Sequence, residues 1–87
     1  MKLSSDYISY EIDGEKILVC LNSSKFAGVV KLNRTADFIV EQLKGGCTKA
    51  ALVAAVTDHF SGVDAQKAEK DIDAVIASLS SIGAIEA

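Results

Sequence analysis

The sequence predicts an α+β fold in which a three-stranded antiparallel sheet is followed by three helices, an arrangement similar to a winged helix-turn-helix. Two observations lead to this prediction. Up to Leu32, apolar and polar residues alternate in short runs, a pattern typical of strands. From Asn33 onward, apolar residues recur every three or four positions, a pattern typical of helices. The length of 87 residues fits one domain that covers residues 1–87.

The first two strands are expected at residues 7–12 and 15–21. The Asp13-Gly14 pair between them is typical of a two-residue hairpin, because a type I′ turn needs positive φ at both central positions. The second strand carries apolar residues on both faces, which indicates a central position in the sheet or cover on both sides. A third strand is expected at residues 26–32.

Three helices are expected after the sheet, at residues 34–44, 49–60 and 65–82, and residues 84–86 are expected to form a stub of strand. The residues whose side chains can accept a backbone N–H of each first turn are Asn33, Thr48 and Asp64. Glycines at 45, 46 and 83 should end the first and third helices. The apolar residues expected on the buried helix faces are Ala36, Ile39, Val40, Leu43, Leu52, Val53, Val56, Phe60, Ala68, Ile72, Val75, Ile76, Leu79 and Ile82.

Composition and charge narrow the range of partners. The formal net charge of −3 argues against nucleic acid or an anionic membrane surface as the main partner. No apolar run approaches the roughly 20 residues of a membrane-spanning helix, and residues 1–6 lack the apolar region of a signal peptide. Cys20 and Cys47 do not make a disulfide framework and are expected to be reduced thiols in a cytoplasmic protein.

No set of residues in the sequence points to catalysis. His59 is the single histidine, and neither a nucleophile nor an orienting group is apparent that would make it a general base. Its position near the end of a helix favours a structural role. Cys20 and Cys47 lack CxxC-type spacing, and a closed zinc site with His59 would need a fourth ligand. We therefore expect a binding protein rather than an enzyme, with no metal and no cofactor.

Several short patterns follow one another in a fixed order along the helical part of the chain. They are Leu32-Asn33-x-Thr35-Ala36-x-x-Ile39-x-x-x-Leu43-x-Gly45, a helix capped by Thr48, Phe60, Asp71-Ile72-x-x-Val75-Ile76-x-x-Leu79, and Gly83-Ala84-Ile85. Together with the hairpin before them, they resemble the PqqD-like family, whose members are also called RiPP recognition elements. The resemblance covers nearly the whole chain and is carried by the ordered set rather than by any single pattern.

The resemblance implies a function. Members of the family are small winged-helix-like chaperones that bind the leader segment of a ribosomally synthesised precursor peptide. They present it to a modifying enzyme, often a radical SAM enzyme. The name-giving member serves pyrroloquinoline quinone biosynthesis and others serve unrelated pathways, so the resemblance does not select a pathway. We expect two partners, a precursor leader and a modifying enzyme, for a chain that is a monomer or a weak homodimer.

The resemblance also implies where the leader binds, as an added strand beside the third strand of the sheet and against the third helix. An edge strand suits this role because its unpaired N–H and C=O groups accept another strand. Val29 and Val30 lie on opposite faces of the strand, so only one can line the groove, and the sequence leaves that choice open. The peptide-binding residues implied in this way are Phe26, Ala27, Gly28, Val29, Val30, Lys31, Leu32, Lys67, Asp71, Ala74 and Val75.

Two aspartates on the third helix are assigned different roles. Asp71 lies on a helical row beside Val75, and the resemblance places this row at the border of the peptide groove. The row consists of Lys67, Asp71, Ala74 and Ser78. Asp73 is expected on a solvated face, where it would pair with Lys67 and Lys70.

Two other functions remain open from the sequence. A winged-helix DNA-binding regulator should present Arg, Lys, Asn or Gln to base edges, whereas the third helix is rich in aspartate and glutamate. An acyl or peptidyl carrier protein needs a phosphopantetheine-bearing serine in an Asp-Ser-Leu context. The nearest match, Ala77-Ser78-Leu79, lacks the aspartate and lies inside a helix. Both alternatives are less well supported than peptide binding.

Overall fold

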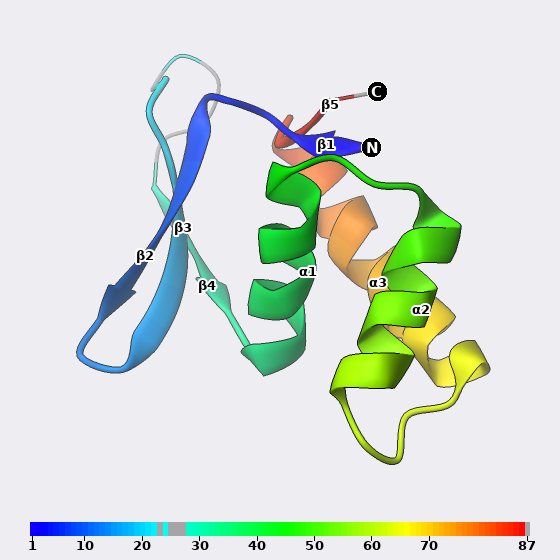
Figure 1. Cartoon of the computed structure of the whole chain (residues 1–87). Helices are drawn as coiled ribbons and strands as arrows, with labels where there is room; N and C mark the ends of the chain where they lie inside the picture. Colours follow the sequence, from blue (N-terminus) through cyan, green and yellow to red (C-terminus); the bar gives the residue numbers. More distant parts are fainter. Residues whose placement is uncertain (23, 25–27, 87) are drawn as a thin grey trace.

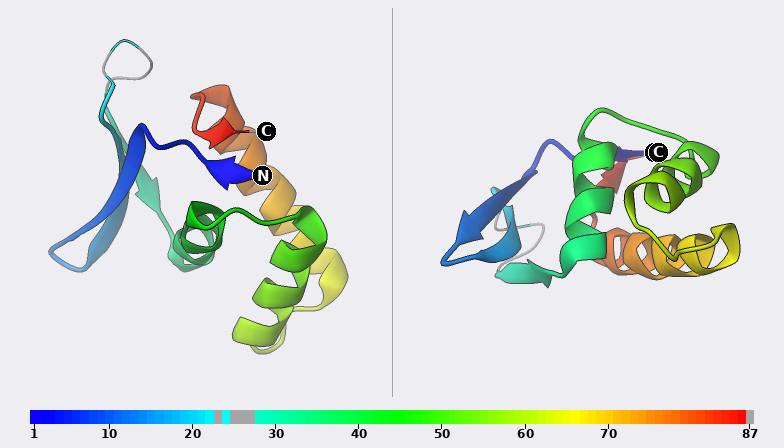
Figure 2. Two further views of the ribbon diagram at one scale, coloured as in Figure 1. Left: turned by 45° about the horizontal axis from the view of Figure 1, so that its top comes forward. Right: turned by 60° about the horizontal axis from the view of Figure 1, so that its bottom comes forward.

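The computed structural model describes residues 1–22, 24 and 28–86. Its elements are β1 (Lys2–Leu3), β2 (Tyr7–Ile12), β3 (Glu15–Cys20), β4 (Val29–Leu32), α1 (Arg34–Lys44), α2 (Lys49–His59), α3 (Ala65–Ser81) and β5 (Ile85–Glu86). Helix α1 occupies the middle of the molecule, with the β2-β3-β4 sheet on one side and α2 and α3 on the other (Figures 1 and 2). The predicted α+β fold, three antiparallel strands followed by three helices, is therefore confirmed.

The larger sheet has the strand order β2-β3-β4, and both pairs are antiparallel. The predicted hairpin is present, because Ile12 and Glu15 are partners on either side of the Asp13-Gly14 turn. β3 is the central strand, which was one of the two explanations offered for its apolar residues on both faces. It ends at Cys20, one residue earlier than predicted.

β4 is shorter than the predicted strand of residues 26–32, since it begins at Val29. Gly28 directly precedes it with a φ of 127°, a conformation that favours glycine, so the extended strand cannot continue backward through this residue. The predicted strand residues Phe26 and Ala27 lie outside the described residues.

A second, two-stranded sheet joins the two ends of the described chain. β1 and β5 are antiparallel, with Leu3 opposite Ile85. Beside them, the Ser4 N–H donates to the Ala84 carbonyl at 2.7 Å. The predicted stub of strand at residues 84–86 is confirmed as β5, whereas β1 was not predicted. A strand of two residues is too short for an alternating pattern to be recognised.

All three predicted helix caps are confirmed. The capping bonds run from the Ala36 N–H to Asn33 Oδ1 (2.8 Å), from the Ala51 N–H to Thr48 Oγ1 (3.1 Å) and from the Lys67 N–H to Asp64 Oδ1 (2.8 Å). At the other end of α1, Gly46 rather than Gly45 takes the left-handed conformation, with a φ of 81° against −87°. Local capping chemistry therefore places each helix start where the sequence predicts it.

Replacing Asn33 by alanine is expected to lower the free energy of unfolding by about 1 kcal/mol, because the first turn of α1 loses its acceptor. Urea denaturation followed by circular dichroism measures this loss. Asn33→Ser, which keeps a capping oxygen, is the matched control and should retain most of the stability. Equal losses in the two variants would mean that the cap does not stabilise the helix.

The hydrophobic core lies on both sides of α1. Ile39, Val40 and Leu43, three of the four α1 residues predicted to be buried, have no exposed surface. The complete buried apolar set is Leu3, Tyr7, Leu18, Ile39, Val40, Leu43, Leu52, Val56, Ala68, Ile72, Leu79 and Ala84. The fourth α1 residue, Ala36, is only half-buried. It lies at the end of α1 that adjoins β4.

Tyr7 connects the larger sheet to the end of α3. Its side chain is only 3% exposed, and its hydroxyl donates to the Ile82 carbonyl. Burial, followed by a hydrogen bond with Cys20, raises the pKa of Tyr7 from 10.0 to about 12. Ionisation of this phenol is therefore easier in the unfolded chain than in the folded one.

The raised pKa of Tyr7 predicts a loss of stability at high pH. Its contribution should be complete below pH 10 and should decline as the pH rises from 10 toward 12, because the unfolded chain releases the proton first. Urea unfolding across this range tests the prediction. Tyr7→Phe should flatten the pH dependence, and an unchanged slope in this variant would assign it to other groups.

Candidate functional site

β4 forms one edge of the larger sheet. It is hydrogen-bonded to β3 on one side, and within residues 1–22, 24 and 28–86 no strand pairs with its other side. Its side chains alternate, so that Val29 and Lys31 are exposed while Val30 and Leu32 are half-buried. Val30, and not Val29, therefore faces the helices.

The turn of the β2–β3 hairpin fixes how backbone hydrogen bonds alternate across the sheet. Asp13 and Gly14 have φ values of 51° and 80°, which identify a two-residue type I′ turn. Residues that flank such a turn exchange both of their backbone hydrogen bonds, and every second pair along the strands does the same. At the far end of the hairpin, the Leu21 N–H donates to the Asp6 carbonyl at 2.6 Å, in agreement with this alternation.

The same alternation assigns the open backbone groups of β4. Leu18 in β3 directs its N–H and C=O away from β2, toward its β4 partner Val30. Val30 consequently directs its own groups back toward β3. The neighbouring residues, Val29 and Lys31, then present their N–H and C=O groups to the open edge.

A groove of about 220 Å³ lies between β4, the start of α1 and α3. Its lining residues are Val30, Lys31, Leu32, Ala36, Ala74, Val75, Ser78 and Leu79. Most of these side chains are small or apolar, so the groove suits apolar side chains that come from the neighbouring edge of β4. The open backbone groups of the β4 edge and the apolar groove thus lie side by side.

The groove contains five of the residues that the sequence predicted for peptide binding: Val30, Lys31, Leu32, Ala74 and Val75. Val29 lies on the edge but turns its side chain to the opposite face of the sheet, and Gly28 precedes the strand. The predicted binding residues did not include Ala36, Ser78 and Leu79. Ser78 had nevertheless been placed on the helical row that borders the groove, since it follows Ala74 by one helical turn.

Lys67 and Asp71 do not line this groove. They lie nearer the start of α3, where Lys67 Nζ and Asp71 Oδ2 are 3.5 Å apart. Asp73 has a different partner from the one predicted, since its Oδ1 lies 2.7 Å from Lys49 Nζ of α2. This ion pair connects two helices that are distant in sequence, which helical spacing within α3 cannot reveal.

A larger hollow of about 630 Å³ is lined by the hairpin turn, the junction of β4 with α1, and the end of α2. Its aromatic part is a cluster in which the His59 ring stacks on Phe38, with centroids 4.2 Å apart and an interplanar angle of 14°. Phe60 meets the His59 ring edge-on at 4.8 Å. His59 therefore packs α2 against α1, which agrees with the structural role predicted for it.

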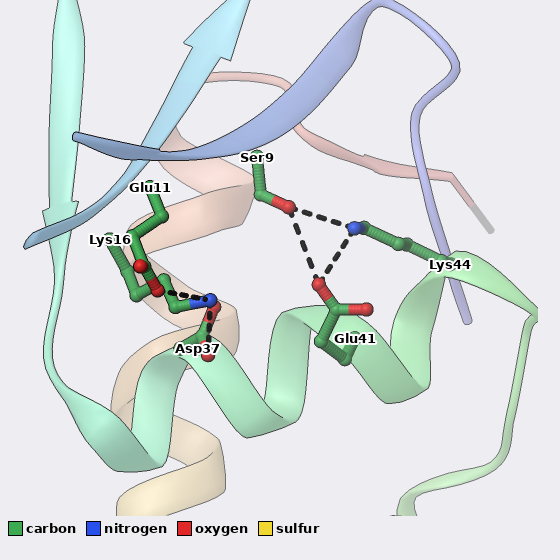
Figure 3. Close-up of polar contacts among 6 residues, drawn as sticks. All are labelled: Ser9, Glu11, Lys16, Asp37, Glu41 and Lys44. Carbon is green, nitrogen blue, oxygen red and sulfur yellow. Dashed lines mark hydrogen bonds and ion pairs between the residues drawn. The ribbon is translucent and has the colours of Figure 1, made fainter. Parts of the chain in front are cut away.

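The face of the sheet that is turned toward α1 is polar near the hairpin turn (Figure 3). Glu41 Oε1 of α1 lies 2.7 Å from Lys44 Nζ, which donates to Ser9 Oγ of β2 at 2.8 Å. Lys16 of β3 lies between two carboxylates, with its Nζ 3.2 Å from Glu11 Oε1 and 3.9 Å from Asp37 Oδ2. Hydrogen bonds to Ser9 and the ion pair between Lys16 and Asp37 thus connect this part of the sheet to α1.

These contacts shift the pKa values of two charged groups. The hydrogen bond from Lys44 holds the pKa of the Glu41 carboxyl below its usual value of 4.5. The hydrogen bond to Glu11, followed by the nearby charge of Asp37, raises the pKa of the Lys16 ammonium. Both side chains are about half exposed, so solvent screens these pairs and their contribution to stability is small.

Across residues 1–22, 24 and 28–86, no three His, Cys, Asp or Glu side chains cluster closely enough to hold a metal ion. Both cysteines are free thiols, as the sequence predicted. None of the described helices combines the length and the apolar character needed to cross a membrane.

Comparisons with known proteins identify both a family and a common fold. The family model described as "Coenzyme PQQ synthesis protein D (PqqD)" matches residues 13–85. No curated protein sequence matches the chain significantly.

Two solved structures have the same fold. One, described as "TbiB1 in Complex with the TbiA(beta) Leader Peptide", has a TM-score of 0.81 at 24% sequence identity, over 99% of this chain and 95% of that one. The other, described as "Lasso peptide synthetase B1 complexed with the leader peptide", has a TM-score of 0.75 at 28% identity, over 95% of this chain and 93% of that one.

Proposed function

We propose that this chain, which belongs to the PqqD family, binds the leader segment of a ribosomally synthesised precursor peptide and presents it to a modifying enzyme. The observation that carries the proposal is the position of the β4 edge directly beside the apolar groove on α3. The two structural neighbours are themselves described as complexes with leader peptides, which supports the same function here.

The leader adds as an extended strand to the open edge of β4. The N–H and C=O groups of Val29 and Lys31 supply hydrogen bonds that depend little on the leader sequence. Leader residues opposite Val30 and Leu32 share their face of the sheet, so their side chains enter the groove on α3. A leader should therefore carry apolar side chains at every second position along the bound segment.

Charges near one end of the groove add selectivity. Asp71 lies one helical turn before Ala74 and Val75, and its side chain is about one third exposed beside Lys67. In our proposal, Asp71 attracts a basic group of the leader and Lys67 attracts an acidic one. Because the two side chains also pair with each other, they contribute less than the backbone edge does.

The chain itself is not an enzyme in this proposal but a single peptide-binding domain. The features that support this role are an open strand edge and an apolar groove, neither of which performs chemistry. The modifying enzyme, for example a radical SAM protein, carries out the reaction in the cytoplasm. Neither DNA binding nor a carrier function gains support, because the groove beside β4 suits an extended peptide.

The direct test is a ¹H–¹⁵N NMR titration with the leader segment of the precursor encoded beside this gene. The largest shift changes are expected along β4 and on the α3 residues of the groove, with smaller ones at Ala36. Changes confined to α2 and the α2–α3 loop would show that the peptide binds elsewhere.

Filling the groove should block the leader without unfolding the protein. Ala74 is exposed and lines the groove, so Ala74→Trp should weaken leader affinity at least about tenfold by steric exclusion. Ala77→Trp is the matched control, because Ala77 is also exposed on α3 but is not part of the groove. Isothermal titration calorimetry measures both, and equal affinities in the two variants would contradict the proposed site.

A further inference from the structure

Lys31 is the charged residue of β4, and it lies at the open edge of the sheet. Both ribbon views place the helices on one side of this sheet, and the opposite side is here called the outer face (Figures 1 and 2). Val30 and Leu32 line the groove on the helix side, so Lys31 between them directs its side chain to the outer face. Directly opposite Lys31 in β3 lies an apolar residue, Ile17.

The ion pair that Lys31 forms within the sheet is long. Its Nζ lies 3.9 Å from Glu15 Oε2, and the two side chains are 78% and 64% exposed. Glu15 lies diagonally across the strand pair, two residues before Ile17 along β3. A long ion pair between exposed side chains holds a lysine only weakly. The Lys31 ammonium can therefore pair with a second carboxylate that approaches from the open side of β4.

Another lysine of the same sheet already lies between two carboxylates. Lys16 is directly opposite Glu11 in the register of β2 and β3, and its Nζ lies 3.2 Å from Glu11 Oε1. The second carboxylate, that of Asp37 in α1, lies 3.9 Å from the same nitrogen. A carboxylate directly across a strand pair thus comes close to a lysine ammonium in this sheet. The position opposite Lys31 on the open side of β4 would allow the same contact.

On the basis of the proposed function, we propose that Lys31 selects leaders that carry Asp or Glu between two apolar residues. In antiparallel pairing, the slightly more stable form, the leader residue opposite Lys31 exchanges both backbone hydrogen bonds with it. Opposite residues share a face of the sheet, so the side chain of this leader residue lies beside Lys31 on the outer face. The leader residues before and after it enter the groove, which requires them to be apolar.

The next outward position of the leader has a different preference. It lies opposite Val29, whose side chain is 57% exposed and continues an apolar row formed by Ile8 and Val19. An apolar leader residue extends this row, whereas a carboxylate there would be opposite valine rather than lysine. The two outward positions of the bound segment therefore differ, and only the one opposite Lys31 favours a negative charge.

Isothermal titration calorimetry with variants of the leader encoded beside this gene tests the selection. Cross-strand NOEs between the leader and β4 identify the leader residue opposite Lys31, which is then replaced by Glu, Gln or Lys. The wild-type chain should bind the Glu leader about fivefold more tightly than the Lys leader, with the Gln leader between them. Lys31→Glu should reverse this order. Ala54→Glu, which adds a negative charge at an exposed site of α2, is the control and should keep the wild-type order.

Two further measurements separate a direct ion pair from other effects. In 1 M salt the Debye length is only about 3 Å, so the difference between the Glu and Lys leaders should become much smaller. Placing the Glu opposite Val29 instead should give no gain in affinity. An equal gain at both positions would mean a general attraction of acidic leaders and would overturn the role of Lys31.

The outcomes also separate this selection from the proposed function. Equal affinities for the Glu and Lys leaders, or an unchanged order in Lys31→Glu, would overturn the selection by Lys31. Strand addition would still stand in that case, because the NOEs between the leader and β4 would be present. A leader that binds without any NOE to β4 would instead contradict the proposed function, and the selection with it.

Discussion

Replacing Lys31 by proline is expected to weaken leader binding at least about thirtyfold, equivalent to roughly 2 kcal/mol, while the sheet remains folded. Lys31 directs its N–H to the open edge, so proline removes a donor that the added strand needs and places its ring against that strand. The sheet tolerates this change because proline is acceptable in edge strands when the lost N–H faces away from the neighbouring strand.

Two further variants separate the backbone effect from other causes. Lys31→Ala removes the same side chain and its ion pair with Glu15 but keeps the N–H, so leader affinity should remain close to that of the wild type. Val30→Pro removes an N–H that faces β3 and should instead destabilise the sheet. Calorimetric titration with the leader, together with circular dichroism, distinguishes these outcomes. Similar leader affinities for Lys31→Pro and Lys31→Ala would exclude strand addition at this edge.

Replacing Leu18 by alanine is expected to lower the free energy of unfolding by about 2–5 kcal/mol. Leu18 has no exposed surface and lies in the central strand, on the face that is turned toward α1. Truncation leaves a cavity between the sheet and α1, where few apolar side chains can move in because hydrogen-bonded and charged side chains occupy the adjoining region. The loss is a large fraction of the roughly 5–15 kcal/mol that stabilises a typical domain.

Urea unfolding measures this loss, and Ile17→Ala provides the comparison. Ile17 is the preceding residue of the same strand, but its side chain lies on the face of the sheet turned away from α1 and is only half-buried. Its truncation should lower the free energy of unfolding clearly less than that of Leu18. Equal losses would mean that the two faces of the sheet are buried to a similar extent in the isolated chain.

The elements that the sequence predicted well are those defined by local chemistry. Asn33 and Asp64 stand directly before helices, and the Asp13-Gly14 pair makes a turn wherever two strands flank it. Each of these signals acts within a few residues of the chain. The predicted hairpin, the three helices and their caps consequently agree with the structure to within one or two residues.

The features that the sequence did not predict depend on contacts between distant segments. The alternation of Ile8, Tyr10 and Ile12 looks the same whether that face is covered or open. Only the packing of the opposite face against α1, which leaves Tyr10 and Ile12 exposed, shows that it is open. The choice between Val29 and Val30 as groove residue depends on the same information.

The candidate site was predicted only in part, because it too depends on contacts between distant segments. Placing β4 against α3 followed from the resemblance, but which turn of α3 adjoins the strand is decided by tertiary packing. Ala74 and Val75 line the groove, whereas Lys67 and Asp71 lie nearer the start of the helix. Lys49, which pairs with Asp73, comes from another helix, so the residue spacing within α3 cannot predict this pair.

The pairing of β1 with β5 has a consequence for the order in which the chain folds. Lys2 and Glu86 are partners, so this small sheet closes a loop that contains nearly the whole polypeptide. The β2–β3 hairpin, by contrast, closes over two residues and needs only microseconds. The entropic cost of closing so long a loop is met only after the helices between the two strands have packed. The strands at the two ends therefore join last during folding and separate first during unfolding, while the leader-binding edge of β4 belongs to the part that forms earlier.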